Sequence, residues 1–202
     1  QVVCIRYRET GSSQAWLRQC AVRGWRDEHL ARAGRTVRVT RVGISDGDGR
    51  AVVGRGRLLV PGLTDGMRVA IVTGGGDKFF SAGWDLKSAT ETGEPPDVFY
   101  GVGGFGGLQE LLGLNKPVIA ALNGMAVGGG FELALSADII VAAEHVRFSL
   151  PEIRAGTLAD AATIKLPKRI PYHIAMDMLF TGRFMDSAEA KQHGLVSEVV
   201  PA

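Results

Sequence analysis

The chain has 202 residues, of which 46% are hydrophobic and 22% charged, and its net charge is +2. This length is enough for one domain with a sizeable core, and the composition is ordinary for a soluble globular protein. The small net charge gives no support for a nucleic-acid or acidic-membrane partner. The two cysteines, Cys4 and Cys20, predict neither a metal cluster nor a secreted disulfide scaffold, so we expect a cytoplasmic protein.

The chain changes character near Met67. Residues 1–67 contain 12 arginines, no lysine and 6 acidic residues, which gives a net charge of +6, whereas residues 68–202 carry −4. The first segment lacks sustained periodicity, and residues 43–57 alternate glycine with Asp and Arg as loops do. We therefore expect an atypical Arg-rich segment over residues 1–66, followed by a folded core over residues 67–202. The first segment is either a solvated arm, an irregular subdomain, or a segment that does not belong to the fold of the core.

Strands and helices alternate in this second part. Apolar, partly β-branched runs predict buried strands, and leucine spacing, a triple glycine and proline punctuation predict helices. The expected strands cover residues 69–72, 117–122, 138–142 and 196–200, and the expected helices cover 104–114, 131–137 and segments within 157–193. This alternation predicts an α/β layered fold.

The most apolar stretch, residues 117–143, is long enough for a membrane span to be considered. Asn123, Glu132 and Asp138 interrupt it, and three consecutive glycines break it in the middle. A buried strand, a glycine-rich turn and a helix explain this stretch better, so we expect no membrane partner.

Several common site patterns do not occur in the sequence. Gly74-Gly75-Gly76 follows a predicted strand, but Phe79 stands where a dinucleotide-binding pattern requires its third glycine. There is no Walker A pattern and no G-x-S-x-G elbow. The four histidines lack the spacing of metal ligands, so we expect no metal site.

Two glycine-rich turns precede predicted helices. In FFSAGWDLK (79–87), small residues lead to Asp85, a plausible helix N-cap, and exposed N–H groups at such a turn suit an anion. In NGMAVGGGFELALSAD (123–138), three glycines precede Glu132, which falls in the first turn of an apolar helix. A carboxylate buried there needs a partner or a purpose.

A second carboxylate, Glu152, follows Pro151 in FSLPEIRAG (148–156). Taken alone, each of these segments also fits an ordinary loop or helix start. Together they supply bare backbone donors and a pair of carboxylates, which are the components of an oxyanion hole and an acid/base pair for thioester enolate chemistry.

These segments, with TGRFMDSAEAKQHGLVSEVV (181–200), resemble the crotonase (enoyl-CoA hydratase/isomerase) superfamily over residues 68–202. The resemblance implies a crotonase-type spiral of ββα units (ClpP/crotonase-like) and a homotrimer or hexamer. The family's first strand-turn is not recognisable in residues 1–66, and its C-terminal helices are missing after residue 202. Residues 157–162 replace the usual proline and paired glycines, which alters the expected rim of the active site.

Residue by residue, the resemblance implies that Glu132 and Glu152 are the two catalytic glutamates of a hydratase or dehydratase. The N–H groups of Ala82 and Gly129 match its oxyanion hole. The loop along the CoA thioester corresponds to Ala82, Gly83, Trp84 and Asp85. The implied reaction adds or removes water at the α,β double bond of an acyl-CoA, with coenzyme A as part of the substrate and no separate cofactor.

Trp84 and the GGGFELAL run are similar to members of the superfamily that act on carnitine-type thioesters. Trp84 either contacts a quaternary ammonium through a cation–π interaction or packs in the core. Two other functions stay open: a general enoyl-CoA hydratase of fatty acid β-oxidation, and a truncated, non-catalytic crotonase-like protein with an Arg-rich arm.

Overall fold

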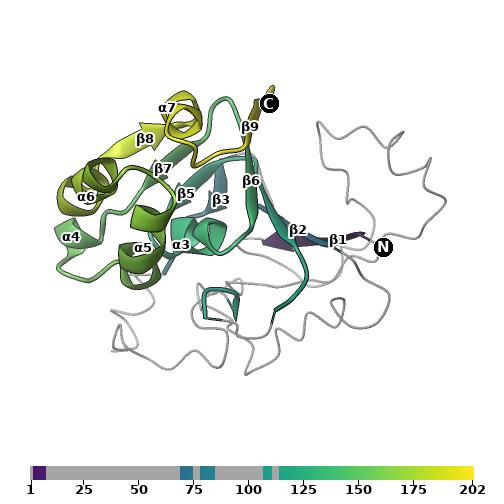
Figure 1. The fold of residues 1–202 in the computed structure, drawn as a ribbon, viewed down its shortest axis with the longest axis horizontal. Helices are drawn as coiled ribbons and strands as arrows, with labels where there is room; N and C mark the ends of the chain where they lie inside the picture. The colour runs from purple at the N-terminus through teal and green to yellow at the C-terminus, as the bar shows by residue number, and fades with distance from the viewer. Residues whose placement is uncertain (1, 8–68, 75–77, 85–106, 111–113) are drawn as a thin grey trace.

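The computed structural model describes residues 2–7 (backbone only), 69–74, 78–84, 107–110 and 114–202. Its strands form two sheets, and its helices gather on one side of the molecule (Figure 1). The first sheet is five-stranded and parallel, in the order β1 (Val2–Tyr7), β2 (Val69–Gly74), β4 (Val118–Leu122), β6 (Ile139–Ala143) and β9 (Glu198–Val200). The second contains β3 (Phe79–Ser81), β5 (Met125–Val127), β7 (Arg147–Ser149) and β8 (Phe184–Asp186), and only its β7–β8 pair is antiparallel.

The described helices are short and follow the strands along the chain. They are α3 (Gly129–Leu135), α4 (Glu152–Ala155), α5 (Asp160–Lys165), the 3₁₀ turn η4 (Leu166–Lys168), α6 (Tyr172–Thr181) and α7 (Ser187–Gln192). Strand β4 of the first sheet is followed by β5 of the second and then by α3, and β6, β7 and α4 repeat this order. The chain therefore winds as ββα units, and the predicted fold class is confirmed.

The expected strands and the expected helix at 131–137 correspond to elements of the structure. The strands expected at 69–72, 117–122, 138–142 and 196–200 correspond to β2, β4, β6 and β9, and the helix expected at 131–137 begins two residues earlier as α3. The helix expected at 104–114 falls largely outside the described residues. Strands β3, β5, β7 and β8 have three residues each, which is too short for an alternating pattern to stand out.

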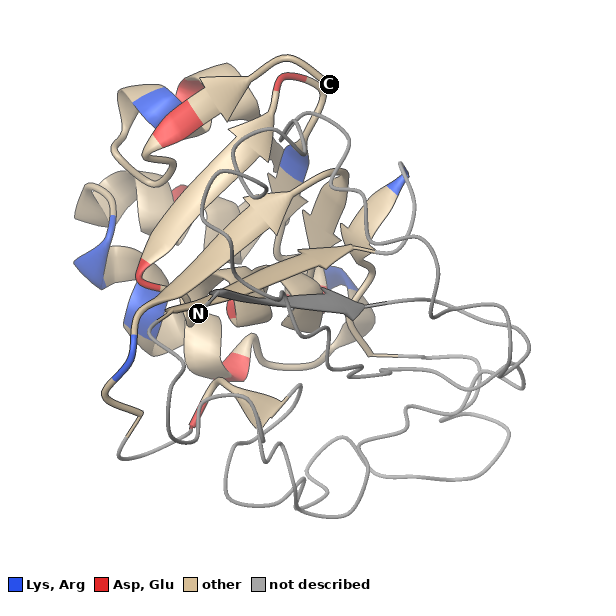
Figure 2. Cartoon of the chain, turned by 90° about the vertical axis from the view of Figure 1, so that its right-hand side faces the viewer, with Lys and Arg blue, Asp and Glu red and all other residues tan. Residues whose placement is uncertain are grey.

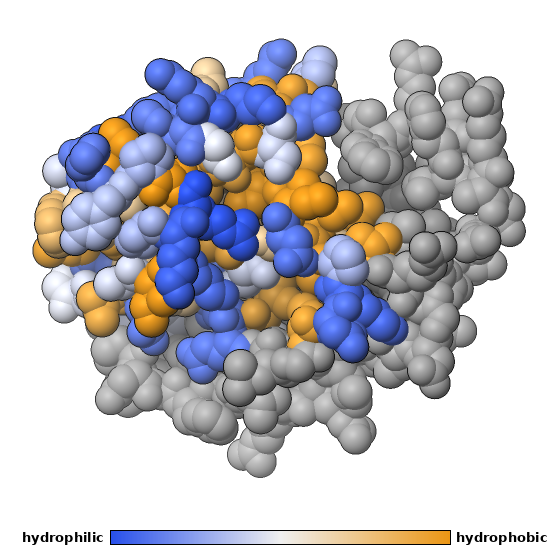
Figure 3. All heavy atoms as spheres, in the orientation of Figure 1, coloured by the Kyte–Doolittle hydropathy of each residue, from blue (hydrophilic) through white to orange (hydrophobic). Residues whose placement is uncertain are grey.

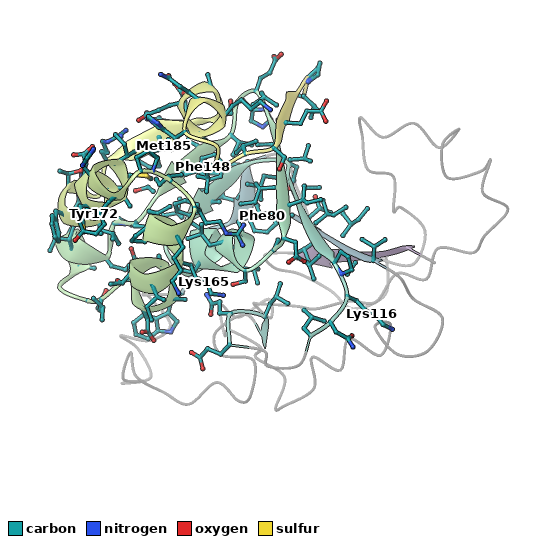
Figure 4. The ribbon with its side chains drawn as sticks, in the orientation of Figure 1. Phe80, Lys116, Phe148, Lys165, Tyr172 and Met185 are labelled. Carbon is teal, nitrogen blue, oxygen red and sulfur yellow. The ribbon has the colours of Figure 1, made fainter. Side chains whose placement is uncertain are left out.

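The core lies between the two sheets and the helices. Strands β2, β4 and β6 carry no charged residue, and in Figure 2 the charges lie mainly on helices, turns and the shorter strands. The rings of Phe131 on α3 and Phe148 on β7 are both fully buried, and their centroids lie 5.1 Å apart. Phe80, Phe148 and Met185, which are labelled in Figure 4, are the contributions of β3, β7 and β8 of the second sheet to this apolar core.

Helix α3 packs unusually close to the end of β3. A Cβ atom added to Gly130 would lie 2.2 Å from the carbonyl oxygen of Ser81, far inside van der Waals contact. The glycine run therefore allows the backbone of α3 to touch the backbone of β3 directly. This contact brings the two glycine-rich segments of the sequence together.

The strand at the N-terminal end, β1, joins the five-stranded sheet at its edge. Val2 to Tyr7 pair in parallel with Val69 to Gly74. Residues 8–68 lie outside the described residues, so the proposed boundary between an Arg-rich segment and the core stays a prediction. In the part of the chain that the structure describes, no helix is both long and apolar enough to cross a membrane.

Candidate active site

Glu132 occupies the first turn of α3, and its side chain is 7% exposed. The N–H group of Ala162 on α5 donates to its Oε1 atom over 2.9 Å, and Nε2 of Gln109 lies 3.4 Å from its Oε2 atom. Both carboxylate oxygens thus have partners from segments that are distant in sequence. The orientation of this carboxylate is fixed by α5 and by the turn at residues 107–110.

Burial raises the pKa of Glu132 from 4.5 to about 7. The neighbouring carboxylates of Glu152 and Asp160 add to this rise, because a second negative charge disfavours ionisation. The hydrogen bond from the Ala162 N–H group works in the opposite direction, since it stabilises the ionised form. A carboxylate with a pKa near neutrality is well suited to exchange protons under cellular conditions.

Glu152 begins α4 and approaches the start of α3 from the other side. Its Oε1 atom lies where a side chain on Gly128 would be, 2.8 Å from the position of a Cβ atom there. Burial raises the pKa of Glu152, and its own backbone N–H group partly offsets the rise. Because Gly128 immediately precedes the helix that carries Glu132, the two glutamates meet at one end of α3.

The two small-residue turns also meet at this end of α3. Gly83 has φ +87°, and a Cβ atom on it would lie 2.8 Å from the Val127 carbonyl oxygen and 2.9 Å from the Gly129 nitrogen. Only glycine accepts both this dihedral angle and this approach without strain. Gly129 opens α3, and the first N–H groups of a helix have no acceptor within the helix itself. The geometry therefore places backbone donors beside both glutamates.

Most of the predicted site residues lie in this one region. Ala82 is exposed and Gly83 and Trp84 are partly buried in the turn after β3, next to Gly129. The N–H group of Gly83 donates to Ser81 Oγ over 3.2 Å, so it is engaged within the turn. Asp85, predicted as a helix N-cap and a CoA contact, lies outside the described residues.

The sequence pattern indicated neither Gln109 nor the backbone of Ala162 as a donor to Glu132. Gln109 lies among leucines within the predicted 104–114 helix, so its burial could have been inferred from its place on the apolar stripe. Ala162 belongs to residues 157–162, which depart from the usual sequence pattern of the family. Its backbone contact leaves no trace in the side-chain pattern.

Within the described ranges, no group of three or more His, Cys, Asp or Glu side chains is arranged to hold a metal ion. The negative charges that raise the pKa of Glu132 are those of Glu152 and Asp160. Two raised carboxyl pKa values beside bare amides suit proton transfer at a carbon next to a polarised carbonyl.

Residues 63–202 match the family model described as enoyl-CoA hydratase/isomerase, and the chain belongs to this family. The resemblance inferred from the sequence motifs is thereby confirmed. Among curated proteins, the chain is 58% identical over 135 residues to a carnitinyl-CoA dehydratase of Citrobacter koseri and to one of Salmonella arizonae. Each alignment covers 66% of this chain and 51% of the relative, so the chain spans about half the length of these relatives.

Solved structures show the same fold. A carnitinyl-CoA dehydratase from Mycobacterium avium 104 is 40% identical with a TM-score of 0.66, covering 74% of this chain and 59% of that one. An enoyl-CoA hydratase from Mycobacterium tuberculosis H37Rv is 42% identical with a TM-score of 0.60, covering 67% and 52%. Both neighbours support the ββα arrangement described above.

Replacing Glu132 should make the protein more stable above neutral pH. Because the folded-state pKa lies above 4.5, the folded chain binds the proton more tightly, and wild-type stability falls as pH rises from about 4.5 to about 7. Glu132→Gln keeps an acceptor for Ala162 but cannot ionise. We expect it to exceed the wild type by about 3 kcal/mol at pH 8 and to match it near pH 4.5.

Urea unfolding of both proteins at several pH values measures this difference. Glu144→Gln, at an exposed turn, is the matched control, and its difference from the wild type should not vary with pH in this way. If Glu132→Gln shows the same pH dependence of unfolding as the wild type, the raised pKa of the buried Glu132 carboxylate would be contradicted.

Proposed function

We propose that the chain carries the catalytic core of a hydratase or dehydratase that adds or removes water at the α,β double bond of an acyl-CoA thioester. The observation that carries the proposal is the meeting of Glu132 and Glu152 at the start of α3, beside the amides of two glycine-rich turns. The family match and the relatives named carnitinyl-CoA dehydratase support it further.

The proposed reaction proceeds through negative charge on the thioester oxygen. Two N–H groups would hold this charge. One belongs to Gly129, and the other belongs to the turn that begins at Ala82, where the sequence motif assigns it to Ala82 itself. Losing one such donor lowers the rate by roughly 10²–10³. Because the thioester supplies the activation, the proposed step requires no metal or redox cofactor.

The two glutamates then have different roles. Glu132, held by Ala162 and Gln109, orients a water molecule and takes its proton as the oxygen attacks the β-carbon. Glu152 delivers a proton to the α-carbon, and burial of its carboxyl group makes the protonated form more accessible than in an exposed glutamate. In the reverse direction, each group transfers its proton the opposite way.

Both glutamates should be essential for hydration of crotonyl-CoA. Glu132→Gln and Glu152→Gln should each lower kcat by about 10²–10⁴, because each removes a general acid or base without changing the shape of the site. The loss of crotonyl-CoA absorbance measures the rate. Glu144→Gln is the control with wild-type kinetics, and a wild type no faster than either glutamate variant would favour the non-catalytic alternative.

We further propose a substrate with a quaternary ammonium, as in a carnitine-type acyl-CoA. Trp84 follows the Ala82–Gly83 turn directly and is only partly buried, which favours a ligand contact over a place deep in the core. Tryptophan is the strongest cation–π partner among the side chains. The relatives named carnitinyl-CoA dehydratase agree with this substrate class.

Trp84→Leu should therefore raise KM for crotonobetainyl-CoA by about fivefold and leave KM for crotonyl-CoA nearly unchanged, since a cation–π contact contributes about 1 kcal/mol. Trp84→Phe keeps an aromatic face, so its KM for crotonobetainyl-CoA should lie between those of the wild type and Trp84→Leu. Steady-state kinetics on both substrates make the comparison. Equal effects on the two thioesters would exclude the ammonium contact and favour the general enoyl-CoA hydratase.

We also propose that the protein assembles as a homotrimer or hexamer and works in the cytoplasm. Large apolar side chains reach the surface on and between the helices α4, α5 and α6, and apolar patches are visible among polar ones in Figure 3. The most exposed are Ile153, Leu158, Ile164, Tyr172 and Phe180. A patch of this kind is typical of a surface that another protein covers.

Light scattering should give a mass of three or six times 21.5 kDa. Leu158→Glu combined with Phe180→Glu should lower it towards one chain, because two charges would be buried in the interface. Ile139→Glu, at the exposed start of β6, is the control and should keep the assembly. A wild type that is monomeric at micromolar concentration would contradict the proposed assembly.

A further inference from the structure

Gln109 is a buried polar residue that the sequence motifs do not include. It lies in the turn at residues 107–110 and is 6% exposed. Its Nε2 atom donates to the carbonyl oxygen of Gly129 over 3.3 Å and to Glu132 Oε2 over 3.4 Å. One amide group thus contacts both a proposed catalytic carboxylate and the residue that supplies a proposed oxyanion donor.

The backbone of Gln109 is held in place by Lys165 on α5, which is labelled in Figure 4. Its Nζ atom donates to the Gln109 carbonyl oxygen over 2.7 Å and to Ser136 Oγ over 2.8 Å. Ser136 Oγ in turn donates to the backbone oxygen of Glu132 over 2.9 Å. The turn of Gln109 is therefore fastened to both ends of α3, at Gly129 and at Ser136.

This arrangement orients the Glu132 carboxylate from two sides. Ala162 holds Oε1 through a backbone N–H group, and Gln109 holds Oε2 through a side-chain amide. A buried glutamine left without partners would lose free energy, so its amide hydrogens are directed to the two acceptors within reach. An amide also cannot ionise, so it supports the carboxylate without adding a competing charge.

We propose that Gln109 is a positioning residue for the hydration step, which holds the Glu132 carboxylate at Oε2 and keeps it in register with Gly129. This inference rests on the proposed function, because it assigns to Glu132 the role of orienting water. Gln109 itself acts through Glu132, and it is not assigned a contact with substrate.

The charges around Glu132 fix the direction of the expected effects. Glu152 on α4 and Asp160 on α5 disfavour its ionised form, whereas the ammonium group of Lys165 on α5 attracts it. The amide of Gln109 donates to the carboxylate and so favours the ionised form. Removing this donor should raise the pKa of Glu132, and a negative charge in its place should raise it further.

The test compares Gln109→Leu and Gln109→Glu with Gln192→Leu, the same leucine substitution at an exposed glutamine on α7. We expect Gln109→Leu to lower kcat about tenfold with little change in KM, since a hydrogen bond to a charged group is lost. The pH profile of kcat/KM should move to higher pH by about one unit in Gln109→Leu and by more in Gln109→Glu. Gln192→Leu should match the wild type.

A second readout does not depend on activity. Carbon-13 NMR follows the carboxyl signal of Glu132, assigned by its absence in Glu132→Gln, and its midpoint should rise in the order wild type, Gln109→Leu, Gln109→Glu. Unchanged midpoints in both variants would overturn the positioning role. If the midpoints follow this order but the wild type does not hydrate acyl-CoA, the result would instead contradict the proposed function. Gln109→Glu has the size of the native residue and keeps the test available where leucine prevents folding.

Discussion

The contact between the end of β3 and the start of α3 determines the rest of the site. Ser81 and Gly130 approach so closely that their backbones touch, and Gly83 lies against Gly129 in the same way. Side chains at these glycines would clash with the facing backbone and force the two segments apart. Because nearly fifty residues lie between Gly83 and Gly130, this packing brings distant parts of the chain together and creates a common surface of backbone amides.

The same packing explains the chemistry of Glu132. The residues of α3 from Gly130 to Leu135 are buried where the helix packs against β3, β5 and α5, so its first-turn carboxylate is removed from water. Burial destabilises the charged form and moves the pKa to a value useful near neutral pH. The free energy lost in this way is a sizeable share of the 5–15 kcal/mol that stabilises a typical domain. A buried carboxylate that lowers the stability of the fold in this way is a candidate for a functional role.

The sequence predicted the two carboxylates and the glycine turns because each has a local pattern: a triple glycine before an apolar helix, and a Pro-Glu pair before a turn. It also predicted β2, β4 and β6, which have five or six residues each, and the shorter β9, which lies at the end of the strand expected at residues 196–200. It could not predict the donors to Glu132. The contact of Ala162 uses a backbone N–H group, and that of Gln109 depends on how the 107–110 turn packs against α3. Both are tertiary contacts that no sequence spacing encodes.

The difference between the two glutamates supports the division of their roles. Glu132 is held at both oxygens, so its lone pairs have a fixed direction, as a group that orients water requires. In the described part of the chain, the buried Oε2 atom of Glu152 has no hydrogen-bond partner. An unpaired buried oxygen is costly when ionised, which agrees with the proposed role of Glu152 as the proton donor. Its Oε1 atom lies against Gly128, one residue before Gly129, the proposed oxyanion donor.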